Sequence, residues 1–91
     1  MDREYFTVKL HSADVDVSKR IRLETHFAEH IERIFLSREG ALLACKCAAA
    51  GAVTDGPFGQ ACAQVSATMR AQGELPSDAH FSISLLQILD L

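Results

Sequence analysis

The amino-acid sequence predicts a small α+β protein in which an antiparallel sheet, built from an N-terminal hairpin and a C-terminal strand, is covered on one face by two or three helices. Size is the first supporting observation, because 91 residues suffice for a single domain, residues 1–91, with one modest core. The second is an alternation of apolar and polar residues near both ends of the chain, which has the period of a half-buried strand. The third is the longer, helical period of the apolar residues between those ends.

The N-terminal hairpin is predicted over residues 4–11 and 14–24. In the first segment, three apolar residues alternate with polar ones and mark a strand with one buried face: Phe6, Val8 and Leu10. In the second segment, four apolar residues again share one parity: Val15, Val17, Ile21 and Leu23. Lys19 interrupts this second pattern, which indicates a bulge or a gap between two short strands. A helix is disfavoured there because Ile21 and Leu23 would not face the same side.

Two helices are predicted in the middle of the chain. From residue 26 onward, the apolar positions follow the stripe of a core-facing helix: Phe27, Ile31, Ile34 and Phe35. Thr25 is a suitable N-cap for this helix, and Gly40 is a suitable stop. Residues 41–53 are less distinct, because six of the thirteen are Ala, which favours a helix, whereas an alternation around Cys45 also permits a strand. Helix is the preferred prediction for this segment.

The clearest helix is predicted over residues 57–72. Its boundaries carry the usual signals: Pro57 in the first turn, Asp55 or Gly56 as the cap, and Gly73 followed by Pro76 at the end. The last strand begins at Phe81, where large apolar residues alternate with Ser, and it continues to Leu91. Its final residues are almost wholly apolar, which predicts a strand that is buried on both faces or covered by a partner.

Composition disfavours several functional classes. Nine basic and twelve acidic side chains give a formal charge of −3, whereas nucleic-acid-binding proteins usually carry a basic excess, so nucleic acid is not an expected partner. The longest apolar runs are too short to cross a bilayer, which needs about 20 residues, and no membrane association is expected. Three cysteines and the lack of a signal-peptide pattern favour a reducing, cytoplasmic location.

The two halves of the chain differ in charge. Sixteen charged residues lie in residues 1–46 and five in residues 47–91. A charge-poor surface beside an apolar strand is typical of the centre of an interface, although dilution of charge by Ala and Ser is the plainer interpretation. We expect a homodimer that forms through the helix at 57–72 or the strand at 81–91. Four residues are the predicted contacts: Gln64, Ser84, Leu86 and Ile88.

A zinc site is one alternative. His26 and His30 lie four residues apart with Glu29 before the second, in the pattern His-x-x-Glu-His, so both imidazoles would lie on one side of a helix. Cys45 and Cys47 would complete a tetrahedral set of two His and two Cys. The plainer interpretation is that both His flank the core stripe on the wet face of an amphipathic helix. That interpretation outweighs the zinc site, and no cofactor is expected.

The cysteines also permit a redox or nucleophilic site. Lys46 would lower the pKa of a neighbouring thiol, either Cys45 or Cys47. The spacing is not Cys-x-x-Cys, however, and burial as a small apolar side chain is the commoner fate of a free cysteine. Cys62 falls on the apolar stripe of its helix and is predicted to lie in the core.

Two weaker features complete the set. Gly56 and Gly59 have the Gly-x-x-Gly spacing with which some RNA-binding loops grip the backbone, at a helix start whose N–H groups could hold an anion. The loop has no Lys or Arg, and Asp55 would use those donors itself as the cap. His11 and His80 lie near strand ends and would meet if the two strands pair.

These observations predict a small, non-enzymatic, cytoplasmic protein that acts through protein–protein interaction, as a regulator, an inhibitor or an immunity-type factor does. No catalytic residue is assigned, because no Ser-His-Asp arrangement and no dinucleotide- or phosphate-binding glycine pattern is visible. Two alternatives stay open. One is the zinc-binding module, and the other is a small ligand-binding or catalytic domain with a pocket between sheet and helices.

Overall fold

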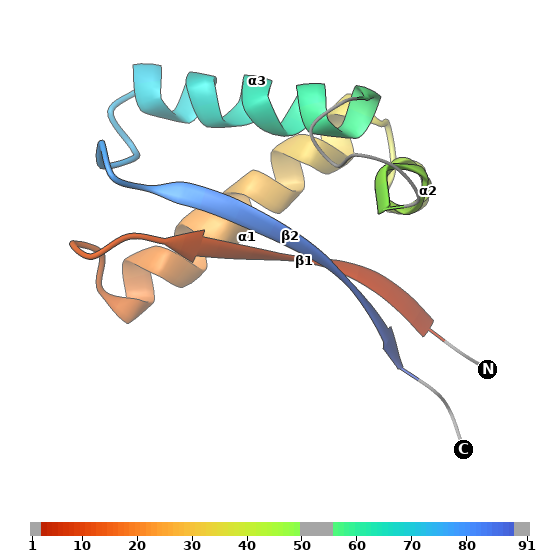
Figure 1. The fold of residues 1–91 in the computed structure, drawn as a ribbon. Coiled ribbons are helices and arrows are strands. Elements are labelled where there is room, and N and C mark those ends of the chain that lie inside the picture. The colour runs from red at the N-terminus through yellow and green to blue at the C-terminus, as the bar shows by residue number, and fades with distance from the viewer. Residues whose placement is uncertain (1–2, 50–55, 89–91) are drawn as a thin grey trace.

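The computed structural model describes residues 3–49 and 56–88, with the side chains of residues 4–46 and 56–85. Two strands from opposite ends of the chain pair with each other, and three helices lie between them in sequence and pack on one face of the pair (Figure 1). The elements follow in the order β1 (Arg3–His11), α1 (Val17–Ile34), α2 (Arg38–Ala49), α3 (Pro57–Ala71) and β2 (His80–Ile88). The predicted α+β class and the antiparallel sheet are confirmed.

The sheet consists of β1 and β2 in an antiparallel register that runs without interruption from Arg3 opposite Ile88 to His11 opposite His80. Both strands form where alternation predicted them, as far as Ile88 for the last strand; residues 89–91 lie outside the described residues. Their apolar parity packs toward the helices and comprises Phe6, Val8 and Leu10 of β1 with Phe81 and Ile83 of β2. Among the described side chains, the other parity is exposed or half-buried and consists of Tyr, Thr, Lys, His and Ser residues, as expected for a sheet with one buried face.

The predicted N-terminal hairpin is wrong, because residues 17–24 are the first turns of α1. Asp16 caps this helix: its Oδ1 accepts the N–H of Lys19 at 2.7 Å. Leu23 is buried and lies four residues before Phe27, so it extends the helical stripe that was predicted only from residue 26. The apolar residues that imitated a strand, Val17 and Ile21, remain 60% and 57% exposed.

The predicted boundaries of the first two helices are also corrected. Thr25 is not an N-cap but lies inside α1, where its hydroxyl donates to the carbonyl of Ile21 at 2.9 Å. Gly40 does not end a helix but lies in the first turn of α2, where its N–H donates to the hydroxyl oxygen of Ser37 at 2.8 Å. A Cβ at Gly40 would meet the carbonyl oxygen of Phe35 at 2.5 Å, so glycine is required by this close approach.

The helix preferred over a strand for residues 41–53 is confirmed as far as Ala49, and residues 50–53 lie outside the described residues. The helix predicted at 57–72 is confirmed as α3, with Gly56 at the N-cap position. It ends as predicted: Gly73 has a φ of 75°, and the N–H of Glu74 bonds the carbonyl of Met69 at 3.0 Å, which closes a Schellman motif.

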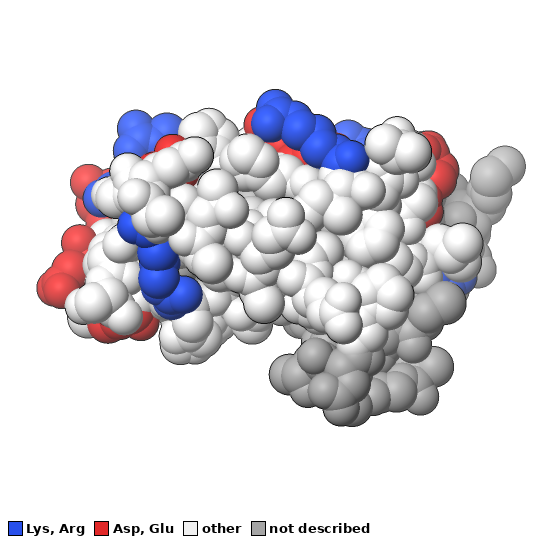
Figure 2. Space-filling model, turned by 90° about the horizontal axis from the view of Figure 1, so that it is seen from above, with Lys and Arg blue, Asp and Glu red and all other residues white. Residues whose placement is uncertain are grey.

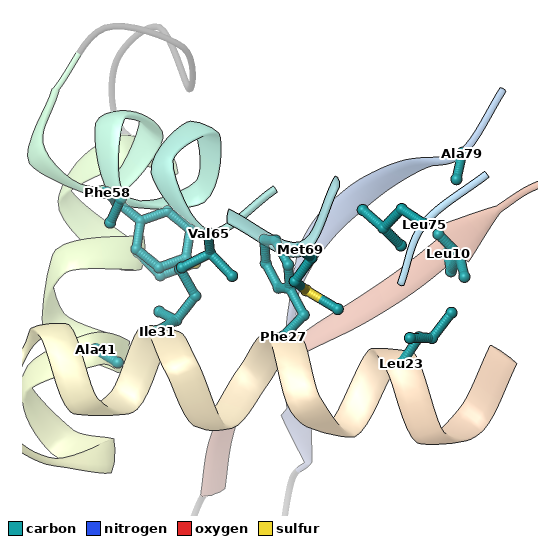
Figure 3. Packing of buried hydrophobic residues seen from close by; sticks show 12 residues of the cluster. Leu10, Leu23, Phe27, Ile31, Ala41, Phe58, Val65, Met69, Leu75 and Ala79 are labelled. Carbon is teal, nitrogen blue, oxygen red and sulfur yellow. The ribbon is translucent and has the colours of Figure 1, made fainter. Parts of the chain in front are cut away.

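The core lies between the helices and the inner face of the sheet (Figure 3). Phe27 and Ile31 of α1 are fully buried, and they face Phe58 and Met69 of α3. Phe27 also stacks on Phe81 of β2, with ring centroids 4.1 Å apart. The same aromatic side chain therefore links α1 to the sheet. None of the helices in the described ranges is long and apolar enough to span a membrane.

Candidate interaction surface

The outer edge of β2 has open backbone groups. Among the described residues, β2 has no neighbouring strand on the side away from β1. Two contacts fix which groups point outward: the N–H of Leu10 is bonded by Glu24 Oε2 at 2.8 Å instead of by β2, and the carbonyl of Ser84 faces Thr7 Oγ1 at 3.3 Å. Along an antiparallel ladder, the backbone N–H and carbonyl groups of a residue point toward the paired strand at one position and away from it, which we call outward, at the next. The outward residues of β2 in the described side-chain range are therefore Phe81, Ile83 and Leu85.

The strand β2 contains no charged residue, no proline and no bulge, which are features that commonly protect an edge strand. Natural edges are blunted by Lys and other charges, by Pro, by bulges or by a covering element. The nine residues His80–Ile88 contain no Asp, Glu, Lys, Arg or Pro, and their register with β1 contains no bulge. Such a strand is a ready template for pairing with another chain.

The edge of β1 differs in its charged residues and in the helix side chains that contact it. The strand carries Arg3, Glu4 and Lys9 within its nine residues. Glu4 forms an ion pair of 2.7 Å with Lys46 of α2, and Glu24 of α1 occupies the outward N–H of Leu10. The helices therefore shield β1 and leave β2 open.

Inner-face side chains of the sheet become more exposed along β2. Phe81 and Ile83 are partly buried against the helices, whereas Leu85 is 41% exposed. Its partner in the register, Phe6, is packed edge-on against Phe58. Figure 1 shows this end of the strand pair leading away from the helices toward the two termini. A partner along β2 would cover the apolar surface that the helices leave exposed.

The exposed face of α3 continues this lack of charge. Its exposed residues are neutral except for Arg70, and they include Gln60, Ala63, Gln64, Ala67 and Thr68. Figure 2, which looks down on α3, shows a broad face without charge and charged side chains around its margins. We call the edge of β2 (His80–Ile88) together with these α3 residues the uncharged surface.

The residues predicted as contacts fall on this surface where they are described. Gln64 is exposed on α3, and Ser84 is exposed on β2. The backbones of Leu86 and Ile88 belong to β2, opposite Tyr5 and Arg3, but their side chains lie outside the described residues.

The predicted zinc ligands lie in different surroundings. His26 is exposed and lines a shallow cavity of about 290 Å³ with Lys19 and Glu74. His30 lines a groove of about 250 Å³ between α1 and α3, together with Gln64. Cys45 is buried in the core, and the side chain of Cys47 lies outside the described residues. Within the described part of the chain, no three His, Cys, Asp or Glu side chains form a group that could hold a metal ion.

The two described thiols differ in burial. Cys45 is buried in the core, whereas Cys62, which was predicted to lie in the core, is half-buried and packs against it. Burial raises the pKa of Cys45, and burial together with the neighbouring Cys45 raises the pKa of Cys62 to about 11. Both side chains are therefore neutral thiols at pH 7, which disfavours nucleophilic chemistry at either of them.

The predicted anion site has no feature beyond a helix start. Gly56 is the N-cap of α3 and makes no side-chain cap bond, and Gly59 lies in the first turn of the helix. The predicted alternative cap, Asp55, lies outside the described residues.

His11 and His80 meet as predicted, at the end of the sheet near the core. Their rings stack with centroids 4.8 Å apart, and His11 Nε2 lies 2.8 Å from Ser82 Oγ. Beside them, Asp78 accepts the hydroxyl of Ser12 at 3.0 Å and the N–H of Ala13 at 2.9 Å. These two hydrogen bonds, and to a lesser degree the nearby His80, lower the pKa of Asp78.

The contacts of this cluster hold the end of β1 against the start of β2. A nucleophilic serine needs oxyanion donors and a substrate cleft as well as a base. Ser82 and His11 lie on the exposed face of the sheet, and neither lines the cavities at Phe6, His30 and His26. Asp78 holds the loop after β1 and does not contact His11.

A cavity of about 420 Å³ lies between β1, α1 and α2. Phe6, Ala28 and Leu42 form its apolar lining. Tyr5 and four charged side chains form the rest, and the charged ones include Glu32, whose carboxylate pairs with Arg38 at 3.5 Å. This cavity corresponds to the pocket between sheet and helices that the sequence left open as an alternative.

Comparison with family models, with curated proteins and with solved structures finds no match to this chain. The function has therefore to be argued from the surface itself. Sequence reasoning missed the role of Glu24, which decides which edge of the sheet is closed. The signal was present: once α1 is recognised as beginning at Val17, Glu24 follows the buried Leu23 and lies beside the sheet.

Proposed function

We propose that this chain is a small non-enzymatic protein that acts by binding another protein through the uncharged surface. One observation carries the proposal: β2 is a nine-residue edge strand with outward backbone groups and no charge, proline or bulge to prevent pairing. Leaving hydrogen-bonding groups and apolar side chains exposed in this way is a liability for a soluble domain unless a partner covers them.

Two further features support a protein partner. The exposed face of α3 adds neutral side chains beside the strand, and depletion of charge is the compositional signature of an interface centre. The charged residues gather instead in residues 1–46, which form β1, α1 and most of α2. A charge-poor half that contains the open edge fits recognition by pairing and packing better than electrostatic recognition.

Native mass spectrometry and light scattering on protein purified without chelator test the proposal. We expect a complex for the wild type, without a metal-sized mass increment, and a weaker complex for Ser84→Asp and Gln64→Glu, because each places a charge on the uncharged surface. Thr7→Asp is the matched control, since Thr7 is exposed opposite Ser84 in the register but belongs to the shielded strand. Equal effects at Thr7 and at both surface positions would contradict the proposal, and a bound zinc ion would favour the metal-binding alternative.

A second candidate function rests on the cavity beside β1. Its volume of about 420 Å³ falls in the range of small-molecule sites, which is roughly 300–1,000 Å³. Ala28→Leu would narrow this cavity from the α1 side. If the cavity is functional, fragment-sized probes will shift the amide resonances of Phe6 and Leu42 in the wild type and not in Ala28→Leu. Shifts at β2 alone would support the first function.

A further inference from the structure

We infer that the partner is a second copy of this chain, joined by antiparallel pairing of β2 with β2 centred on Ile83. The inference rests on the proposed function and specifies its partner and its register. The resulting dimer contains one continuous four-stranded antiparallel sheet in the order β1-β2-β2-β1, with the helices of both copies on the same face.

The backbone supplies the required hydrogen bonds in this register. The outward residues Phe81, Ile83 and Leu85 are those whose N–H and carbonyl groups are not used by β1. With Ile83 opposite Ile83 of the second copy, Phe81 lies opposite Leu85 of that copy. All three positions become hydrogen-bonded pairs of an antiparallel ladder, with about six inter-chain N–H···O bonds.

The sequence around Ile83 reads the same in both directions by residue class. The order Phe81-Ser82-Ile83-Ser84-Leu85 is apolar, Ser, Ile, Ser, apolar. Antiparallel self-pairing therefore sets Ser opposite Ser on the open face and apolar opposite apolar on the inner face. Such self-complementarity is what a two-fold interface between identical chains requires, because the same patch must match itself.

Side-chain exposure indicates the same register. Leu85 is 41% exposed on the inner face, and Phe81 is only partly buried on β2. In the paired sheet, Leu85 meets Phe81 of the second copy at the distance of directly opposite residues, where aromatic–aliphatic pairs are stabilising. The contact brings no like charges together, because β2 contains no acidic residue, lysine or arginine.

The edge of β1 does not compete for the second copy. Glu24 already occupies the outward N–H of Leu10, and the ion pair of Glu4 with Lys46 lies at the other end of the strand. Pairing along β1 would have to displace a charge-assisted hydrogen bond. Among the described residues, no side chain is bonded to the outward groups of Phe81, Ile83 and Leu85, and Arg70 of α3 bonds the carbonyl of Ala79, directly before β2.

An isotope-filtered NOE experiment on a mixed dimer of ¹³C-labelled and unlabelled full-length chains tests the register. The expected result is a set of inter-chain contacts from the Phe81 ring of one copy to the Leu85 methyl groups of the other. Leu85→Lys is expected to weaken dimerisation at least about tenfold, because the apolar pair is lost and an edge charge is gained. Leu43→Lys is the control, since Leu43 is also an exposed leucine, 63% accessible, on α2.

The outcomes separate this inference from the proposed function. A dimer that is weakened by Gln64→Glu but not by Leu85→Lys, and that lacks the Phe81–Leu85 contacts, overturns the β2 pairing and keeps an interface on α3. A dimer that no change on the uncharged surface weakens overturns both. A chain that stays monomeric at about 1 mM overturns self-pairing, and the function would then require a different protein.

Discussion

β1 and β2 are strands of equal length that form the two edges of one sheet, yet only one edge is protected. β1 carries three charged residues, and α1 and α2 place Glu24 and Lys46 against it. β2 carries no charged residue, and among the described residues its outward backbone groups at Phe81, Ile83 and Leu85 have no hydrogen-bond partner. The difference shows that, among the described residues, the helices place charged side chains against the edge of β1 and not against the outward groups of β2.

The largest expected effect comes from removing the buried Phe27 side chain of α1, on which the sheet packs. Phe27→Ala removes a fully buried ring that stacks on Phe81 and lies beneath the sheet. We expect a loss of about 3–5 kcal/mol in the free energy of unfolding, as for other buried Phe truncations. Urea denaturation followed by circular dichroism measures it, with the exposed Leu43→Ala as the control. A loss below about 1 kcal/mol would mean that the described packing of the sheet on α1 is wrong.

A pair of proline variants sharpens the assignment of inward and outward groups on β2. Ser84→Pro removes an N–H that belongs to the ladder with β1 and should cost about 2–3 kcal/mol of monomer stability. Leu85→Pro removes an outward N–H and should cost clearly less, while abolishing dimerisation. Thermal unfolding of dilute protein and light scattering of concentrated protein report the two effects separately. The reverse order of monomer stabilities would contradict the assignment.

The next largest effect on stability is expected from removing Glu24, which occupies the outward N–H of Leu10 on the edge of β1. Glu24→Ala leaves the part-buried N–H of Leu10 without its carboxylate acceptor, which should cost about 1–2 kcal/mol. Hydrogen exchange at Leu10 should become faster, and exchange at Ile83 should stay unchanged. Glu24→Gln retains a carbonyl oxygen and should lie between the wild type and Glu24→Ala. Unchanged exchange at Leu10 in Glu24→Ala would show that Glu24 does not close the edge.

The smallest effect concerns Asp78, which lies before β2 and is hydrogen-bonded to the loop after β1. Hydrogen bonds from Ala13 and Ser12 lower the pKa of Asp78 below its ordinary value in the folded chain. A lowered pKa means that the stabilising contribution is complete above the unfolded-state pKa, which is about 3.9. It is lost as the pH falls through the folded-state pKa.

We therefore expect the melting temperature of the wild type to approach that of Asp78→Asn as the pH falls below about 4. Both proteins are measured by calorimetry from pH 7 to pH 3. A difference in melting temperature that stays constant over this range would contradict a role for the Asp78 carboxylate.

Local sequence patterns sufficed for the elements whose signal lies entirely within their own residues. Period-two alternation gave β1 and β2, and the Gly and Pro signals gave α3. The hairpin prediction failed because Val17 and Ile21 imitate a strand, while the competing signals were the cap at Asp16 and the helical spacing of Leu23 from Phe27. Charge distribution alone pointed to β2 and to Gln64 and Ser84.

What could not be predicted depends on contacts between distant residues. Glu24 reaches Leu10 across fourteen positions, and without that contact the outward residues of each strand cannot be assigned. The direction of α2 relative to α1, which carries Cys45 into the core, could not be predicted for a different reason: it depends on the conformation of the turn at Leu36. Leu36 has a φ of 66°, which is uncommon for leucine and gives no signal in the sequence.

Hydrogen exchange as a function of protein concentration tests the central claim most directly, because it reads both edges in one sample. We expect the amides of Ile83 and Leu85 to exchange fast in dilute protein and to become protected as the concentration rises, while Leu10 remains protected throughout by Glu24. Exchange at Ile83 and Leu85 that is independent of concentration would contradict the claim that the open edge of β2 pairs with a second copy.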